Sequence, residues 1–353
     1  MIEIDGSHGE GGGQILRTSV ALSALTMKPI RVVNIRLRRP KPGLKFQHVT
    51  GIELTGQLVD AEVTGLEVGS TELEFVPHKR RGGSFKMNIG TAGSISLVLQ
   101  AVLPAAVLSP NSVRFTLTGG TDVKWSPPVD YLQHVFGHML KRMGPEMKIR
   151  QVKRGHYPRG GGIVECDVIP STQLNPINEA DFGEPVNVEG ISHCVKLPSH
   201  VAERQARTSE KIIRSELGLE PDIHIEHYPK ENDPHLGPGS GIVLWAESNN
   251  GLRLGADSLG ERGVRAESVG KRCANRLVDE VLTGRAVDSH LCDMLIPYLA
   301  VASGKSIIGV TEITSHLLTN ISTVREVLGT SVEVEGESGK PGMIEIQGSG
   351  FSL

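Results

Sequence analysis

A histidine at the start of an amphipathic helix is well suited to attack a phosphate. Four apolar residues of "EITSHLLTNISTVREVLG" recur at helical spacing: Leu317, Ile321, Val324 and Leu328. Thr314 or Ser315 can cap this helix and Gly329 can end it, so His316 falls in the first turn. The positive end of a helix favours the neutral, nucleophilic imidazole and offers amides to a phosphate. The alternative is a histidine that only caps or packs locally.

A second histidine lies in a matching place. The segments "FQHVTGI" and "TSHLLTNI" put His48 and His316 at the starts of corresponding helices of an internal repeat. Either histidine could serve as the nucleophile, with the other binding the phosphate.

The segment "GSHGEGGGQILR", residues 6 to 17, places one carboxylate, Glu10, among glycines before an apolar run. Glycines at a helix start allow backbone N–H groups to approach an anion. A carboxylate among them is useful for holding a metal ion on a phosphate. Gln14 replaces the last glycine of GxGxxG, which argues against a dinucleotide site. A plain tight turn is the alternative.

Basic residues gather without any acidic residue in "RLRRPKPGLKFQH": Arg36, Arg38, Arg39, Lys41, Lys45 and His48. The Pro-Lys-Pro-Gly core predicts a loop rather than a helix face. We expect a phosphate-binding surface here, because Arg31 and the nearby Arg17 extend the same sign of charge. Ordinary surface charge is the alternative.

Other motifs carry less weight. The "GKS" at 304–306 has Leu299 in place of the first Walker glycine and joins a helix to a following strand, so it predicts a turn. There is no HExxH, and His224, Glu226 and His227 make a weak case for a metal site. The four cysteines form no CxxC pair, which disfavours a zinc ribbon or a disulfide framework.

The candidate residues are positioned by a pattern of helix, strand, helix and two strands that recurs along the chain. The copies run from "QILRTSVALSAL" to "STELEFVPH", from "FKMNIGTAG" to "GIVECDVIP", and from "HLCDMLIPYLAVAS" to "GMIEIQG". The first copy includes an expected strand "IRVVNIRL", and the second an expected helix "VDYLQHVFGHMLKRMG" over 129–144. The residues between the second and third copies do not fit and indicate a separate α/β unit. We predict an α/β (α+β) fold, with residues 1–184 and 280–353 forming a large domain of three repeats and 185–279 a small insert domain.

Composition is that of an ordinary globular protein, with 353 residues, 38% hydrophobic and 22% charged. A net charge of -3 argues against indiscriminate nucleic-acid binding by the whole surface. No apolar run reaches the roughly 20 residues that span a bilayer, and "MIEID" lacks the features of a signal peptide. We therefore expect a cytoplasmic protein without a membrane partner. Association into a homo-oligomer stays open.

Several phrases together carry a family resemblance: "GSHGEGGGQILRTSVALSAL", "RRPKPGLKFQH", "GTAGSISLVLQAVLP", "GGTDVKWSPPVDY", "GHYPRGGG", "HVAERQ", "GPGSG" and "SHLLTNISTVREVL". The chain resembles the RNA 3'-terminal phosphate cyclase family over nearly its whole length. The resemblance implies three βαβαββ repeats in a large domain, with a smaller α/β insert interrupting the third repeat. This is the organisation that the periodicity indicates.

The resemblance also implies a ligase-type reaction in RNA processing, with ATP, a divalent cation (Mg or Mn) and an RNA that ends in a 3'-phosphate. In the family's reaction a histidine attacks the α-phosphorus of ATP, and AMP then passes to the RNA 3'-phosphate. The neighbouring 2'-hydroxyl closes a 2',3'-cyclic phosphate and expels AMP.

Residue roles follow by position in the family's motifs. The resemblance implies a catalytic group formed by His316 as the nucleophile together with Glu10, Arg17, Arg39 and His48, with Glu10 also near the metal. It implies that Arg36, Arg39 and Gln47 face the phosphate at the RNA end, beside Arg17 and His48. It implies a nucleotide pocket formed by Gln100, Pro128, His290, Leu291, Cys292, Asp293 and Met294.

The chain departs from the family pattern at two of these positions. The family usually has Asp-Gln where this chain has Asp293-Met294, and often an aromatic residue where it has His290, which could stack on the base instead. Two other classes of protein are built from similar repeats. A non-catalytic relative acting in ribosomal RNA processing lacks the histidine, so His316 argues against it. An enolpyruvyl transferase would use six repeat units, so three repeats and an insert disfavour it.

Overall fold

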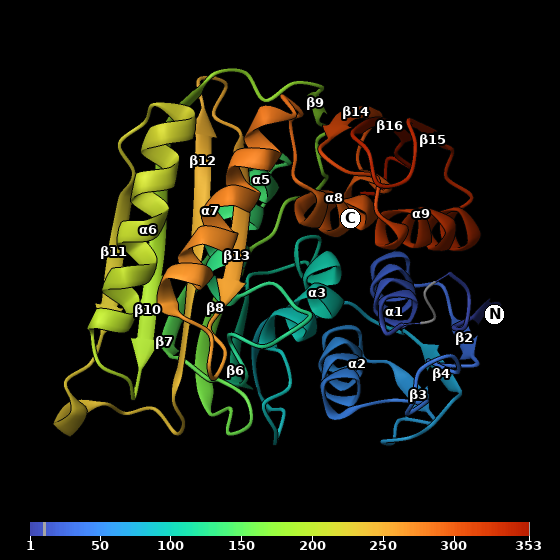
Figure 1. Cartoon of the computed structure of the whole chain (residues 1–353). Coiled ribbons are helices and arrows are strands. Elements are labelled where there is room, and N and C mark those ends of the chain that lie inside the picture. Colours follow the sequence, from blue (N-terminus) through green and yellow to red (C-terminus); the bar gives the residue numbers. More distant parts are fainter. Residues whose placement is uncertain (10–11, 353) are drawn as a thin grey trace.

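The computed structural model describes residues 1–9 and 12–352, whose strands form four sheets (Figure 1). The first sheet contains β1 (Ile2–Asp5), β2 (Ile30–Val33), β4 (Leu73–Val76) and β3 (Glu62–Thr64). The second contains β5 (Gly83–Asn88), β6 (Val113–Gly119), β8 (Gly162–Ile169) and β7 (Glu146–Lys153). The third contains β9 (Asn178–Glu179), β14 (Lys305–Val310), β16 (Gly342–Gln347) and β15 (Val332–Glu335). Each of these three sheets follows the order first, second, fourth, third strand.

These three sheets also share one pairing pattern. The first two strands of each sheet are parallel, and the remaining pairs are antiparallel. A parallel pair needs a crossover connection. It contains α1 (Gln14–Thr26) in the first sheet, α3 (Ile95–Ala106) in the second, and α8 (Ser289–Leu299) in the third. The second helix that follows each pair is α2 (Phe46–Val59), then a helix in three parts, then α9 (Ser315–Leu328).

The fourth sheet lies within the connection of the third. It contains β11 (Asp222–His227), β10 (Pro185–Val195), β12 (Gly239–Ser248) and β13 (Arg253–Leu259). Two long helices, α6 (His200–Leu217) and α7 (Ala266–Leu282), pack on each other and on this sheet (Figure 1). A short 3-10 turn spans Lys230–Asn232. The predicted mixed α/β fold is confirmed, and the boundaries of the two domains remain a prediction.

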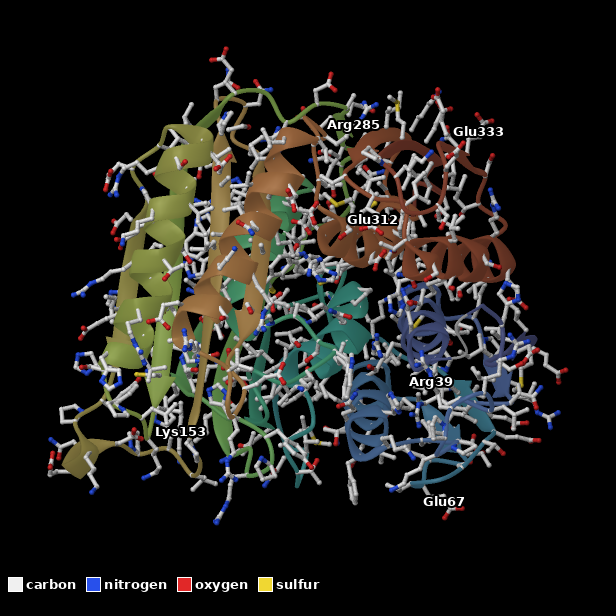
Figure 2. All side chains as sticks on the ribbon, viewed as in Figure 1. Arg39, Glu67, Lys153, Arg285, Glu312 and Glu333 are labelled. Atoms are coloured by element: carbon white, nitrogen blue, oxygen red, sulfur yellow. The ribbon has the colours of Figure 1, made fainter. Side chains whose placement is uncertain are left out.

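Five helices meet where the first and third sheets approach each other. α1 packs on α2, α3, α8 and α9, and α3 also packs on α2 and α8. Buried side chains from all four sheets belong to one hydrophobic cluster, among them Phe75, Phe115, Leu244 and Ile344. Exposed charged residues such as Glu67 and Glu333 point outward (Figure 2). None of the helices in the described part of the chain is long and apolar enough to cross a membrane.

Two predicted elements differ from the structure. The strand expected over "IRVVNIRL" ends at Val33, because Asn34 and Arg36 adopt positive φ values of 55° and 56°. The helix expected over 129–144 is divided into α4 (Val129–Tyr131), a π-helical turn (Leu132–Phe136) and α5 (Gly137–Arg142). A π-helical turn inserts a residue into the regular hydrogen-bond ladder, which periodicity alone does not reveal.

Candidate active site

His316 lies in the first turn of α9, as the sequence predicts. The hydroxyl of Thr314 accepts a hydrogen bond from the backbone N–H of Leu317 at 2.9 Å and so caps the helix. Gly329 ends it with a φ of 70°. The apolar face of α9 is buried, whereas His316 is exposed at the positive end of the helix.

Gln14 fixes the ring of His316. The Gln14 amide Nε2 donates to the backbone carbonyl of His316 at 3.0 Å, and its Oε1 lies 2.5 Å from His316 Nδ1. A carbonyl can only accept, so the amide nitrogen must face it and the amide oxygen must face the ring. Nδ1 therefore carries the hydrogen that Oε1 accepts. In the neutral ring, the lone pair is then on Nε2.

A second set of contacts, one turn further along both helices, repeats this link. The Thr18 hydroxyl donates to Asn320 Oδ1 at 2.7 Å, and Asn320 Nδ2 donates to the backbone carbonyl of Asp293 at 2.7 Å. The Asp293 carboxylate in turn accepts from the hydroxyl of Thr314 at 3.1 Å. α1, α8 and α9 are thus joined by side chains around the end of α9 that carries His316.

A cavity of about 420 Å³ opens beside this point. Its described lining comes from α1, α3, α8, α9, the segment before α4, the π-helical turn after α4, and the fourth sheet with α7. The lining residues are Gln14, Arg17, Thr18, Ala21, Leu97, Gln100, Pro104, Trp125, Ser126, Pro127, Phe136, Asp257, Arg276, His290, Asp293, Met294, Pro297, Tyr298, His316 and Asn320. The structure therefore brings six of the predicted site residues to one cavity: Arg17, Gln100, His290, Asp293, Met294 and His316. The other described ones are outside the lining: Arg36, Arg39, Gln47, His48, Pro128, Leu291 and Cys292.

Arg17 gives this cavity a positive charge. Burial lowers the pKa of its guanidinium to about 10, which leaves it charged at neutral pH. Across residues 1–9 and 12–352, no carboxylate pairs with Arg17. A partly buried cation that lines a cavity and has no carboxylate partner among the described residues favours an anionic ligand such as a phosphate.

The glycine segment lets three other elements approach closely. A Cβ on Gly13 would lie 2.3 Å from His48 Nε2, and one on Gly12 would lie 3.1 Å from Arg39 Nη2. Gly9, with a φ of 57°, approaches the Thr319 hydroxyl of α9 in the same way. Side chains at these positions would push the basic loop and α9 away from the glycine segment. Glu10 and Gly11 lie outside the described residues, so the role of Glu10 remains a prediction.

His48 is buried beside this segment and has the opposite tautomer to His316. The backbone N–H of Lys45 donates to His48 Nδ1 at 3.1 Å, so the ring hydrogen is on Nε2. Burial, followed by the nearby charges of Arg17, Arg36 and Lys45, lowers the pKa of His48 to about 3. The ring is therefore neutral, and its Nε2–H lies against Gly13 at the start of α1.

The basic loop divides into structural and exposed residues. Arg36 Nη1 donates to the carbonyls of Lys41 and Gly43 at 2.9 and 2.8 Å, which holds the loop together. Arg39 is exposed and packs on Gly12. Gln47 Oε1 accepts from the backbone N–H of Ser94, at the start of α3, at 3.0 Å.

Arg31, which extends the positive charge of this segment in the sequence, is neutralised by carboxylates in the structure. Its guanidinium pairs with Glu72 at 3.0 Å, Glu3 at 3.5 Å and Glu74 at 3.8 Å. Glu3 lies on β1, Glu74 on β4 and Glu72 directly before β4, and only the fold brings them around Arg31.

The far side of the cavity contains a half-buried His290. Arg276 Nη2 donates to His290 Nε2 at 2.9 Å, and burial together with this cation lowers the pKa of His290 to about 3. Asp257 lies nearby on β13, and burial raises its pKa to about 6. Leu291 and Cys292 lie in the same turn of α8 as His290, but their side chains are buried in the core. Pro128 is buried at the start of α4.

Several lining residues were not identified from the sequence. In the sequence, Gln14 is notable only because it breaks GxGxxG, although its place directly after the glycines is a usable signal. Asp257 and Arg276 come from the predicted insert, and no motif marks them. Trp125, whose side chain is almost fully exposed at the cavity, stands in "GGTDVKWSPPVDY", where no chemical motif marks it.

Comparison with known proteins identifies the family. The family model described as RNA 3'-terminal phosphate cyclase matches residues 8–334. The chain belongs to this family. Relatives named RNA 3'-terminal phosphate cyclase include those of Methanopyrus kandleri, 53% identical over 99% of both chains, and Ignicoccus hospitalis, 52% identical over 99% of both. The relative from Staphylothermus marinus is 51% identical over 100% of this chain and 99% of its own. The resemblance inferred from the sequence is thereby confirmed.

Proposed function

We propose that this protein is an RNA 3'-terminal phosphate cyclase that uses ATP, with His316 as its nucleophile. The observation that carries the proposal is the paired contact of Gln14, which donates to the His316 carbonyl and accepts from Nδ1. This contact assigns the lone pair of the neutral ring to Nε2, in a side chain that lines the cavity. Membership of the family supports the overall reaction.

The first step would form a histidyl-AMP. His316 Nε2 attacks the α-phosphorus of ATP, a nitrogen–phosphorus bond forms, and pyrophosphate leaves. The imidazolium that results can keep its Nδ1 hydrogen bond to Gln14. Arg17 would neutralise phosphate charge, and His290 with the apolar wall formed by Leu97 and Pro104 would hold the base.

Two further steps complete the reaction. AMP passes from His316 to an oxygen of the RNA 3'-phosphate, which restores the imidazole. The neighbouring 2'-hydroxyl then attacks that phosphorus, loses its proton and expels AMP. The tautomer of His48 suits it for binding rather than attack, because Nε2–H can donate to the phosphate at the start of α1 while Nδ1 is occupied by Lys45.

A divalent cation would neutralise charge on the phosphates. Mg and Mn prefer oxygen ligands, and carboxylates are the usual protein donors. Asp293 is a carboxylate of the cavity that fits this chemistry. Glu10 is the second candidate ligand by its place in the family motif.

Labelling with α-labelled ATP tests the nucleophile. Wild-type protein, incubated with a divalent cation and then denatured, should retain a label that is acid-labile and alkali-resistant, as a phosphoramidate is. His316→Ala should retain none, and His48→Ala should still be labelled. Equal labelling of the His316→Ala protein would remove His316 from the mechanism.

An RNA that ends in a 3'-phosphate tests the overall reaction. With ATP, its terminal phosphate should become resistant to phosphatase, and no such conversion should occur without ATP. RNA binding by a folded protein that neither takes the label nor converts the end would favour the non-catalytic alternative, a factor in ribosomal RNA processing.

A further inference from the structure

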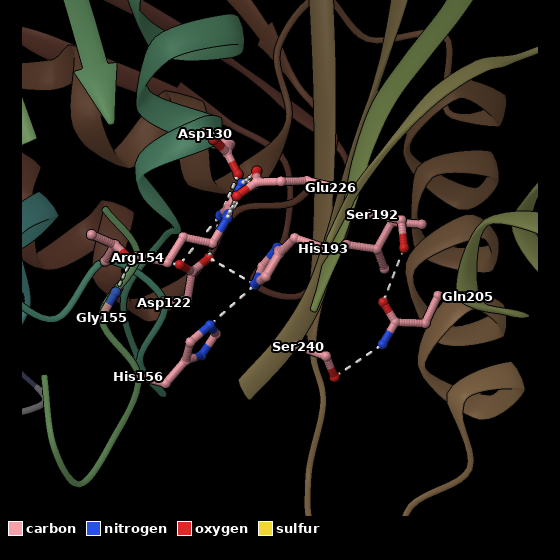
Figure 3. Close-up of polar contacts among 12 residues, drawn as sticks. Asp122, Asp130, Arg154, Gly155, His156, Ser192, His193, Gln205, Glu226 and Ser240 are labelled. Atoms are coloured by element: carbon pink, nitrogen blue, oxygen red, sulfur yellow. Dashed lines mark hydrogen bonds and ion pairs between the residues drawn. The ribbon is translucent and has the colours of Figure 1, made fainter. Parts of the chain in front are cut away.

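A buried cluster of two histidines and an aspartate lies away from the cavity, where the second sheet meets the fourth (Figure 3). Asp122 follows β6, His156 follows β7, and His193 lies on β10. Their side chains come from segments far apart in the chain and are all buried, with residue exposures of 2%, 7% and 0%. None of the three lines the cavity that contains His316.

We propose that Asp122, His156 and His193 form a binding site for one zinc ion, with a water molecule as the fourth ligand. One donor atom from each residue lies within 4.8 Å of the other two. His193 Nε2 is 3.2 Å from His156 Nε2 and 3.8 Å from Asp122 Oδ1. Ligands about 2.0–2.2 Å from a tetrahedral zinc lie roughly 3.3–3.6 Å apart, so small movements would place the metal between them.

The direction of the donor atoms supports this site. One hydrogen bond between the two imidazoles would explain the 3.2 Å contact. It would not explain why Asp122 Oδ1 also faces His193 Nε2, at a distance too long for a hydrogen bond. A metal ion at the centre accounts for the convergence of all three atoms.

Outer contacts hold the carboxylate in this orientation. Asp122 Oδ2 accepts from the Thr121 hydroxyl at 2.6 Å, and Arg154 Nη1 lies 3.3 and 3.4 Å from its two oxygens. Fixing of a ligand by groups outside the coordination shell is typical of metal sites.

Glycines of β12 make room for the two rings. A Cβ on Gly239 would lie 2.1 Å from the ring of His156, and a Cβ on Gly241 would lie 2.9 Å from His193 Cε1. Both imidazoles are therefore packed in place rather than directed to solvent.

The surrounding charges favour a cation. Arg154 pairs with three carboxylates: Asp130 at 2.8 Å, Glu226 at 2.6 Å and Asp122 at 3.3 Å. The acidic groups outnumber this buried guanidinium, and two neutral imidazoles add no charge to balance them. A dication would balance the excess. In addition, His193 Nδ1 is buried without a hydrogen-bond partner among the described residues. An ordered water beside the site would supply that partner.

The site would join the fourth sheet to a wall of the cavity. Asp122 precedes Trp125, Ser126 and Pro127, which line the cavity, by only a few residues. The proposed zinc would therefore fix the base of this segment. It differs in ligands and place from the Mg or Mn ion expected on the phosphates, and it does not depend on the proposed reaction.

Metal analysis of the whole chain, purified without chelators, metal-affinity resin or a histidine tag, tests the proposal. Wild-type protein should contain about one zinc per chain, and His156→Gln and His193→Gln should each contain less than about one-fifth of that. His134→Gln is the matched control, because His134 stacks on Trp245 at 4.3 Å outside the cluster. This control should retain the zinc.

Cobalt substitution keeps the test decisive if the variants fail to fold. Wild-type protein stripped with a strong chelator and reloaded with Co²⁺ should show the intense visible absorption of a tetrahedral site, and added Zn²⁺ should abolish it. Wild-type protein with less than about one-tenth of a zinc per chain and no such absorption would overturn the proposal, leaving a hydrogen-bonded pair of neutral imidazoles.

Discussion

The starts of α2 and α9 carry histidines at matching places in the sequence, yet the structure gives them opposite chemistry. His48 is buried, and its Nδ1 accepts a hydrogen bond from the backbone of Lys45, so the hydrogen is on Nε2. His316 is exposed, and its Nδ1 donates to Gln14, so the lone pair of the neutral ring is on Nε2. Sequence similarity between repeats therefore does not imply a shared role. The partner of one ring nitrogen decides what the other can do.

Replacing each of the two histidines separately is the strongest test of this comparison. We expect His316→Asn to lower the rate of protein adenylylation by at least about 10⁴-fold, because the nucleophile is lost. His48→Gln should stay within about tenfold in this step, because the glutamine amide still offers an N–H donor. Single-turnover labelling with excess ATP measures both rates.

The control for folding is the thermal transition of each variant. A His48→Gln protein that folds and yet loses labelling as completely as His316→Asn would contradict the division of roles between the two residues.

Gln14 offers a test of the tautomer itself. Gln14→Ala should lower the adenylylation rate by about 10²-fold, because the ring loses the acceptor that orients it. Gln14→Glu should raise the pKa of His316, since a carboxylate stabilises imidazolium, and its activity should recover only as the pH rises. The measurement is the pH dependence of single-turnover labelling.

Thr18→Val is the matched control for Gln14, because it removes the hydrogen bond to Asn320 one turn away. It should alter stability without moving the pH profile. If the profile of Gln14→Glu superimposes on that of the wild type, Gln14 does not set the protonation of His316.

For Asp257, on the opposite wall of the cavity, we expect a smaller effect that appears as a pH-dependent change in the free energy of unfolding. Its pKa of about 6 in the folded protein lies above that of aspartate in an unfolded chain, about 4. Its contribution is therefore favourable at low pH and is lost as the pH rises through 6. Asp257→Asn should be more stable than the wild type by about 2–3 kcal/mol at pH 7, with the difference almost gone near pH 4.

Urea unfolding across this range of pH measures the difference. Asp279→Asn, at an exposed position of α7, is the control and should show no such trend. A constant difference between Asp257→Asn and the wild type from acid to neutral pH would exclude this origin.

The smallest expected effect concerns RNA binding by the loop before α2. Arg38 is exposed and Lys45 partly so, and reversing either charge should weaken RNA binding a few-fold at low salt. If each contacts one phosphate, the slope of log affinity against log salt should fall by about 1 per residue. Arg31→Glu is the comparison, because Arg31 is engaged by glutamates and should leave the slope unchanged. Identical slopes for all of these variants would remove the loop from RNA binding.

The sequence by itself determined the local features of this protein. Helical spacing, Thr314 and Gly329 were enough to place His316 in the first turn of α9, because capping and amphipathicity act over a few residues. The mixed α/β fold followed from alternating periodicities, and the family followed from short phrases spread along the chain.

Tertiary structure decided everything that depends on contacts between distant segments. Gln14 and His316 are 302 residues apart, so no local pattern could show that one fixes the tautomer of the other. Arg31 belongs to a basic run in the sequence, yet three glutamates surround it in the structure and neutralise its charge. Asp122, His156 and His193 likewise converge only because the fold brings the segments after β6 and β7 to β10. Protonation, charge pairing and coordination depend on a few ångströms between side chains, which the packing of distant elements sets.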